Sequence, residues 1–244
     1  MKSNSTLVII LGFSLYLSGC FISLFFSSNL LWGEMEARLY TPQTGQRKLD
    51  IHCPLVIATW ETATVSTTVI NTLANKDVKP QVNAFISHEG GARVESQTFE
   101  LEPFESASMQ WTATSADIIF KRLILVNVIQ RPYRDLESRQ GACSIYVYSL
   151  FGLDGRNTLI LIVEAGVLST LLGAGLLIYR FRPFTELTKK LLQSNIVFVV
   201  FVLAGLFSSL SRLWGLTLFL NATALLVITV ATIEILLGSS KPAN

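Results

Sequence analysis

Four long apolar runs constrain this 244-residue chain more than any other feature. Hydrophobic residues make up 50% of the sequence and are concentrated in these runs. A hydrocarbon core about 30 Å thick needs roughly 20 apolar residues in a helix, and most of the runs reach that length. We therefore expect an integral membrane protein with four transmembrane helices. The runs cover residues 7–31, 159–179, 196–210 and 213–237.

The first run, within residues 1–32, has the layout of a signal anchor. A short polar start with Lys2 is followed at once by apolar residues. The stretch Leu17-Ser18-Gly19-Cys20 also resembles a bacterial lipobox, which would make the protein a lipoprotein anchored at Cys20. The apolar run continues past Cys20 as far as Phe26, so we favour an uncleaved transmembrane helix. Both alternatives place the following segment outside the cytoplasm.

The segment 50–150 is the part of the chain expected to fold in water, after a linker over 33–49. Residues 63–70 alternate between apolar and polar types, which is typical of a strand with one buried face. Turn-forming clusters separate further runs of this kind. About seven short strands in about 100 residues favour an immunoglobulin-like β-sandwich, and therefore an α + β membrane protein. The expected strands are 51–59, 63–72, 80–87, 93–102, 106–114, 121–130 and 143–149.

Several motifs in this segment resemble bacterial immunoglobulin-like modules of the CARDB and NEW3 kind. A glutamate turn at Glu61 leads into a strand that ends at Asn71, and Leu101 to Glu105 forms a later turn before another strand. Phe104 stands where these modules usually have glycine. The resemblance covers about residues 50–130. It implies a non-catalytic module that presents a surface or spaces other domains, and the whole layout resembles multi-pass bacterial membrane proteins that carry such a module.

The cysteines divide by location. Cys20 lies in the first apolar run, whereas Cys53 and Cys143 bracket the water-soluble segment. If this segment lies outside the cytoplasm, we expect a disulfide between Cys53 and Cys143; two unpaired buried thiols are the alternative. Such a bond could stabilise the fold by roughly 4–5 kcal/mol in the chain-entropy model.

The polar stretch 131–141 follows the most apolar strand of the segment. We expect it to be an exposed loop and a candidate contact surface. A plain solvated hairpin loop is the alternative.

The helix expected at 158–180 carries small residues at four-residue spacing: Ala165, Ser169 and Gly173. Small side chains let helix backbones approach closely in a membrane. This seam can serve packing within the protein's own bundle or contact with another subunit. Polar residues within the apolar runs are candidates for an intramembrane site, and these are Glu164, Asn221 and Glu234.

Basic residues set the expected orientation. Arg180, Arg182, Lys189 and Lys190 lie in the loop 181–194, which the positive-inside rule places in the cytoplasm. Both chain termini, including the tail 239–244, are then cytoplasmic, and residues 33–157 are extracytoplasmic. The remaining helices are expected at 195–211 and 213–238, joined by a tight hairpin.

The sequence carries no phosphate-binding glycine loop, metal-ligand cluster or nucleophile elbow, and its net charge is only +2. We therefore expect no cofactor, no metal and no nucleic-acid partner. The expected function is that of a non-catalytic structural or accessory subunit of the cell membrane. Its partners would be membrane lipids and either other membrane-protein subunits or further copies of itself. The alternative is a membrane enzyme or transport component with a site between the helices.

Overall fold

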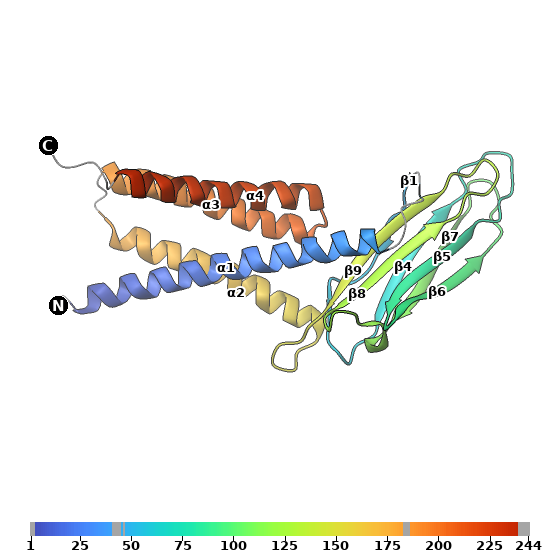
Figure 1. Ribbon diagram of the computed structural model, residues 1–244, viewed down its shortest axis with the longest axis horizontal. Helices are drawn as coiled ribbons and strands as arrows, with labels where there is room; N and C mark the ends of the chain where they lie inside the picture. Colours follow the sequence, from blue (N-terminus) through green and yellow to red (C-terminus); the bar gives the residue numbers. More distant parts are fainter. Residues whose placement is uncertain (1–2, 41–44, 46, 183–185, 239–244) are drawn as a thin grey trace. The chain divides into compact units, whose positions relative to one another are not determined.

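The computed structural model describes residues 3–40, 45, 47–182 and 186–238, and combines helices with a β-rich region (Figure 1). The chain forms two compact units. Residues 1–31 and 160–244 make up a helical unit, and residues 32–159 make up a β-rich unit. Helices α1 and α2 each contribute residues to both units.

Within the described residues, four helices are long and apolar enough to cross a membrane. Their number and approximate positions agree with the prediction. Three boundaries differ by three or more residues: α1 ends at Leu39 and not at residue 32, α2 starts three residues early, and α3 starts within the segment predicted as the loop 181–194. Residues 183–185 of that loop and the tail 239–244 lie outside the described residues. The helices are α1 (Ser3–Leu39), α2 (Gly155–Arg180), α3 (Glu186–Leu210) and α4 (Trp214–Gly238).

The β-rich unit contains two sheets. The larger, mixed sheet has the strand order β1-β9-β8-β5-β6, with β3 also paired to β9, and the smaller sheet has the order β2-β4-β7. A 3₁₀ turn, η1 (Ser115–Asp117), precedes β8. The strands are β1 (Arg47–Lys48), β2 (Ile51–His52), β3 (Val56–Ile57), β4 (Ala63–Ile70), β5 (Gln81–His88), β6 (Gly91–Thr98), β7 (Ser106–Ala113), β8 (Leu123–Gln130) and β9 (Arg139–Val147).

The hydrophobic core lies between the two sheets, which makes the unit a β-sandwich. Val65 and Trp111 of the smaller sheet pack in one cluster with Val126 and Ile145 of the larger sheet. Burial alternates along β4 as the sequence predicted, because only one face of this strand meets the core.

Strand β8, by contrast, is buried on both faces. Its outer face is covered by the last two turns of α1, in which Gly33 and Ala37 are buried. The prediction of a linker over 33–49 was therefore wrong for residues 33–39, which are helical. The charged residues in this stretch suggested a loop, whereas the packing against the sheet stabilises a helix.

Two strand predictions also need correction. The predicted strand 51–59 is two short strands, because the chain passes from the smaller sheet at β2 to the larger sheet at β3 across Pro54. Proline has no amide N–H to donate, which suits such a break. The predicted strand 143–149 begins at Arg139, since the polar residues Arg139 and Gln140 pair with β1. The expected loop 131–141 is therefore shorter.

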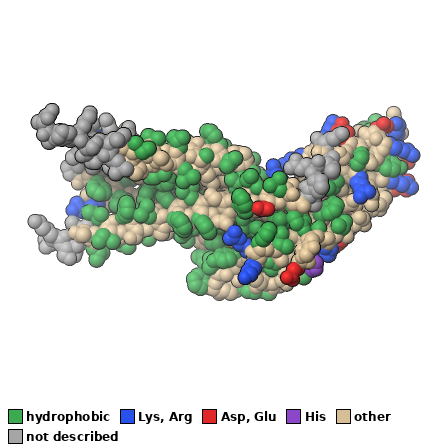
Figure 2. All heavy atoms as spheres, in the orientation of Figure 1, with side chains coloured by type: hydrophobic (Ala, Val, Ile, Leu, Met, Phe, Trp, Pro, Cys, Tyr) green, Lys and Arg blue, Asp and Glu red, His purple; other side chains and the backbone are tan. Residues whose placement is uncertain are grey.

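In the helical unit, α1, α3 and α4 share an apolar cluster formed by Tyr16, Cys20, Phe198, Val202 and Ala224. The visible surface of the helices is mainly hydrophobic, whereas charged side chains gather on the β-sandwich (Figure 2).

Candidate functional site

The predicted disulfide is present in the structure. It joins Cys143 of β9 to Cys53, which lies between β2 and β3, with the two Cα atoms 6.7 Å apart. Cys143 is fully buried in the sandwich core. Because β2 and β9 belong to different sheets, the bond ties the two sheets together.

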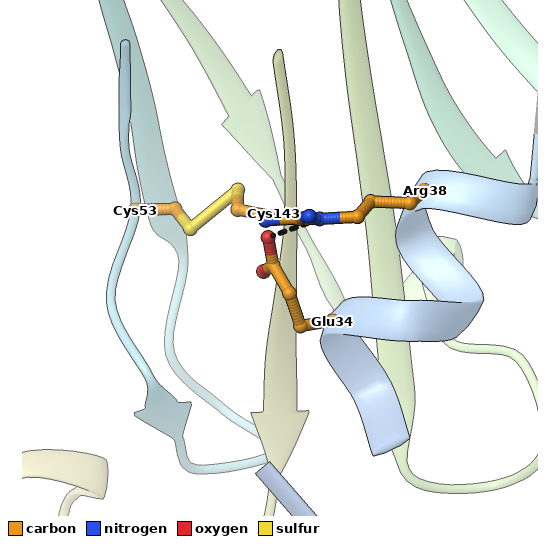
Figure 3. Close-up of a disulfide and its surroundings, with 4 residues drawn as sticks. All are labelled: Glu34, Arg38, Cys53 and Cys143. Atoms are coloured by element: carbon orange, nitrogen blue, oxygen red, sulfur yellow. Dashed lines mark hydrogen bonds and ion pairs between the residues drawn. A yellow bond between two sulfur atoms is a disulfide. The ribbon is translucent and has the colours of Figure 1, made fainter. Parts of the chain in front are cut away.

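The end of α1 docks on the other side of β9 (Figure 3). The backbone of Gly33 lies so close to β9 that an added Cβ would be 2.8 Å from the Ser144 hydroxyl and 2.9 Å from the Tyr146 ring. The side-chain amide of Asn127 donates to the carbonyl of Ala37 at 3.4 Å. A side chain at position 33 would push the helix away from the sheet.

An ion pair accompanies this junction. Glu34 is buried, and one of its carboxylate oxygens accepts from Arg38 Nε at 3.2 Å, one helical turn later. Figure 3 shows this pair beside the strand that carries Cys143. A buried carboxylate is costly unless it is paired, so the partner on the same helix makes the burial of Glu34 possible.

Tyr146 shares this contact. Burial raises its pKa to about 12, while the nearby Arg122 and a hydrogen bond with the backbone of Gly33 partly oppose the rise. The neutral phenol is therefore the form that suits the packed junction between α1 and β9.

Glu61 holds the start of α2 against the sandwich. One carboxylate oxygen accepts from the amides of Ala58 at 2.6 Å and of Gly155 at 2.8 Å. Gly155 has no room for a side chain, because an added Cβ would lie 2.3 Å from the Ile57 Cα. Asp154 caps the helix by accepting from the amide of Asn157 at 2.7 Å. Both helical connections are therefore built into the β-sandwich.

Asn71, which carried part of the family resemblance, is buried just after β4, at the end of this strand away from Glu61. Its side-chain amide donates to the carbonyls of Lys76 and Glu102 at 2.9 Å, and its side-chain oxygen accepts from the amide of Leu73 at 3.0 Å. Phe104 adopts φ 61°, a left-handed conformation that glycine would adopt without strain. The motif therefore keeps its turn although phenylalanine replaces glycine.

An ion pair with a buried carboxylate and a half-buried arginine joins β6 to η1. The carboxylate of Asp117 is almost fully buried and accepts from Arg93 Nε at 3.2 Å and Nη2 at 3.1 Å. It also accepts from the amide of Thr114 at 2.8 Å. Sequence reasoning did not identify this pair, because the two residues are 24 positions apart and neither lies in a motif.

The predicted contact loop is partly folded inward. Tyr133 and Leu136 form an isolated bridge, and Leu136 is buried in the core. Asp135 stays on the surface, where its pairing with Lys76 lowers the pKa of its carboxyl. The loop therefore offers a smaller free surface than predicted.

In the helical unit, α1 and α2 cross at a seam of small residues. An added Cβ at Gly173 would lie 2.3 Å from the Tyr16 amide nitrogen, and one at Gly19 would lie 2.3 Å from the Thr170 nitrogen. Gly173 was among the predicted packing residues. The predicted Ala165 and Ser169 are only partly buried, and their neighbours Gly166 and Thr170 are the buried members. The seam therefore agrees with the prediction at Gly173 and lies one residue later at the other two positions.

Asn221 connects three helices. Its side-chain amide donates to the Ser27 hydroxyl of α1 at 3.0 Å. An added Cβ at Gly205 of α3 would lie 2.4 Å from the Asn221 side-chain oxygen, so this glycine makes room for the polar group. Ser208 and Thr217 add a second polar contact between α3 and α4, at 2.8 Å.

The other predicted intramembrane candidates do not gather around Asn221 in the described residues. Glu164 is exposed on α2, and the side chain of Glu234 lies outside the described residues. Cys20, the lipidation residue of the lipoprotein alternative, is buried among the helices. The described residues contain no group of three or more His, Cys, Asp or Glu side chains that could hold a metal ion.

No protein-family model matches this chain, and no curated protein sequence matches it. Solved structures with some likeness include a CARDB domain from Pyrococcus furiosus in complex with di-metal ions. It is 16% identical with a TM-score of 0.32, and the match covers 44% of this chain and 99% of that one.

Two larger proteins match more partially. A cycloisomaltooligosaccharide glucanotransferase from Paenibacillus sp. is 22% identical with a TM-score of 0.34, over 43% of this chain and 14% of that one. The alkylpurine DNA glycosylase AlkC from Pseudomonas fluorescens is 18% identical with a TM-score of 0.29, over 50% of this chain and 36% of that one. This chain thus spans a minor part of both proteins. All three likenesses are too weak to establish a fold or a function.

Proposed function

We propose that this chain is an integral membrane protein that crosses the bilayer four times and presents an immunoglobulin-like sandwich outside the cytoplasm. The surface of the helices carries this proposal. Only 17% of the most apolar window is buried in α2 and in α4, and 28% and 33% are buried in α1 and α3. Large side chains such as Leu172, Phe219 and Leu226 are more than half exposed. A bilayer would cover this apolar surface.

The strand order supports the immunoglobulin-like assignment. One sheet joins β2, β4 and β7, and the other joins β9, β8, β5 and β6. In immunoglobulin lettering, β2, β4 and β7 correspond to strands A, B and E of one sheet. Strands β9, β8 and β5 correspond to G, F and C of the other sheet, and β6 is an added edge strand beside C. This is a Greek-key order of immunoglobulin-like sandwiches.

Two features support an extracytoplasmic sandwich. Disulfides such as Cys53–Cys143 persist mainly in oxidising compartments. Arg180 ends α2 and Arg182 follows it, at the end of the helix remote from the sandwich sequence, and positive residues favour the cytoplasmic side. The chain termini are then cytoplasmic.

We infer further that the protein acts as a structural or accessory subunit. Several of its polar side chains already serve internal contacts: Glu61 holds α2, Asp117 binds Arg93 and Asn221 contacts Ser27. Groups used in this way support the architecture and leave the outer surfaces for partners. An uncleaved α1 fits this role, because Gly12, Tyr16 and Gly19 pack against α2.

Topology can be tested by introducing single cysteines into a C20S background and labelling intact cells with a membrane-impermeant maleimide. Ser96 on the exposed strand β6 should label when changed to cysteine, whereas Arg182→Cys should label only after the membrane is permeabilised. The reverse pattern would contradict the proposed orientation. The intact mass of the recovered chain would decide between an uncleaved helix and a lipoprotein anchored at Cys20.

The accessory role can be tested by purifying the tagged protein from its native membrane in gentle detergent. Stoichiometric recovery of other membrane proteins would support the role and identify the partners. Recovery of the chain alone would favour the intramembrane alternative. In that case E164A, N221A and E234A should abolish function, whereas the accessory role predicts that they preserve it.

A further inference from the structure

Three loops lie together at one end of the β-sandwich. The strand pairing shows why. Ile57 pairs with Val147, so β3 and β9 end side by side. Leu123 pairs with Tyr146, so β8 begins next to them. The connection 58–62 follows β3, 114–122 precedes β8, and 148–154 follows β9. Helix α2 begins at the same end, where Gly155 is bound by Glu61. We call this the α2 end of the sandwich.

These loops expose four aromatic side chains, here called the aromatic rim. Relative exposure is 59% for Trp60, 68% for Phe120, 49% for Tyr148 and 92% for Phe151. Elsewhere on the described strands and their turns, the exposed large hydrophobic residues are Ile70, Val94 and Phe104, of which only Phe104 is aromatic. Scattered apolar residues are ordinary, whereas a gathered apolar surface marks an interaction site.

The charges of the same loops complement the rim. Lys121 and Arg122 are exposed there, and Arg156 is exposed in the first turn of α2. The three carboxylates of these loops are each engaged by the protein: Glu61 by the amides of Ala58 and Gly155, Asp117 by Arg93 and Thr114, and Asp154 by Asn157. The exposed charge is therefore mainly basic.

We propose that the aromatic rim inserts into the headgroup region of the outer leaflet, with the basic side chains beside it contacting lipid phosphates. The bilayer is the expected partner of the aromatic rim, because Phe151 lies only four residues before the start of α2. Aromatic side chains favour the boundary between lipid and water, and basic side chains favour anionic headgroups. This inference rests on the proposed membrane-spanning role of α2. The sandwich would then be held against the membrane surface by lipid contacts as well as by its helices.

Phe104 provides a matched control at the opposite end of the sandwich. Ile70 pairs with Ser106, so the turn before β7 lies at the end of β4 remote from Trp60. Phe104 is 69% exposed, and its φ of 61° resembles the φ of 51° at Phe120 and of 52° at Phe151. Position 104 therefore matches the rim in residue type, exposure and backbone conformation, and differs in location.

The test places the photo-crosslinker p-benzoylphenylalanine at position 120, 151 or 104 of the full chain in nanodiscs of phosphatidylethanolamine and phosphatidylglycerol. After irradiation, mass spectrometry should find several-fold more phospholipid adduct from positions 120 and 151 than from 104. Position 171 lies on the exposed surface of α2, so lipid adducts from it test whether this helix spans the membrane. Lipid adducts from 171 without an excess at 120 and 151 would overturn the rim alone. Absence of adducts from 171 would overturn the proposed function as well.

A second measurement avoids the unnatural residue. The fluorescence of Trp60 is the difference between the wild type and W60F. Its loss in nanodiscs with acyl chains brominated near the headgroup measures how strongly the lipid quenches Trp60. F120G/F151G removes two rim side chains at positions where glycine suits the positive φ. It should reduce the quenching of Trp60 several-fold, whereas F104G should not. Equal quenching in all variants, or crosslinks from 151 to a protein chain in place of lipid, would overturn the proposal.

Discussion

At the residue scale, Glu61 is the contact that binds α2 to the β-sandwich. Its carboxylate accepts hydrogen bonds from two backbone amides, and one of these belongs to Gly155, the first residue of α2. E61A should lower the free energy of unfolding by about 1–3 kcal/mol, because buried amides lose their acceptor. E61Q keeps an oxygen acceptor and should lose less. Thermal unfolding in detergent measures both, and an E61A protein as stable as wild type would contradict the assignment.

Tyr146 makes the packing of α1 sensitive to alkaline pH. Its folded pKa of about 12 lies above the ordinary value of 10. The stabilising contribution is therefore complete below pH 10 and is lost as the pH rises through about 12. Each unit of pKa difference corresponds to about 1.4 kcal/mol, so the total is about 2–3 kcal/mol. The melting temperature of wild type should fall more steeply between pH 10 and 12 than that of Y146F. Parallel curves would contradict this effect.

At the element scale, the seam between α1 and α2 depends on Gly173. An added side chain would meet the backbone of Tyr16 and the carbonyl of Gly12, whereas nothing lies within 4 Å of the position of a Cβ at Gly175. G173V should destabilise the helical unit by about 1–3 kcal/mol through overpacking. G175V is the matched control two residues away and should be nearly neutral. Equal melting temperatures for the two variants would show that the helices do not cross at this seam.

The sequence predicted elements best where local pattern alone decides them. The alternation along 63–70 and the apolar runs led directly to β4 and to the helices. The segment 33–39 was misjudged because charged residues such as Glu34 and Arg38 suggest a loop when the covering sheet is unknown. The start of β9 was missed for a similar reason, since Arg139 is ordered by pairing with the distant β1.

The contacts within the candidate sites depended still more on tertiary structure. The disulfide could be predicted because few cysteines were available to pair. The seam on α2 could be located only to within one residue, because small residues occupy adjacent positions and only the partner helix selects Gly166 and Thr170. Arg93 and Asp117 carry no local pattern that would associate them.

At the scale of the whole molecule, the disulfide connects the two edges of the domain sequence. Cys53 and Cys143 are separated by 90 residues, with α1 before this interval in the sequence and α2 after it. Without the bond, the unfolded domain would gain the conformational freedom of a long open loop. The chain-entropy model gives about 4–5 kcal/mol for a closed loop of this length.

C53S/C143S should therefore unfold at a lower temperature than wild type, and dithiothreitol should lower the melting temperature of wild type to that of the double variant. C20S is the control, because Cys20 is a free cysteine and its removal should leave the response to dithiothreitol unchanged. Maleimide should label unfolded wild type at one cysteine before reduction and at three after it. Identical melting of oxidised and reduced protein would mean that the sheets hold together without the bond, and that packing of α1 and α2 against the sandwich supplies the restraint instead.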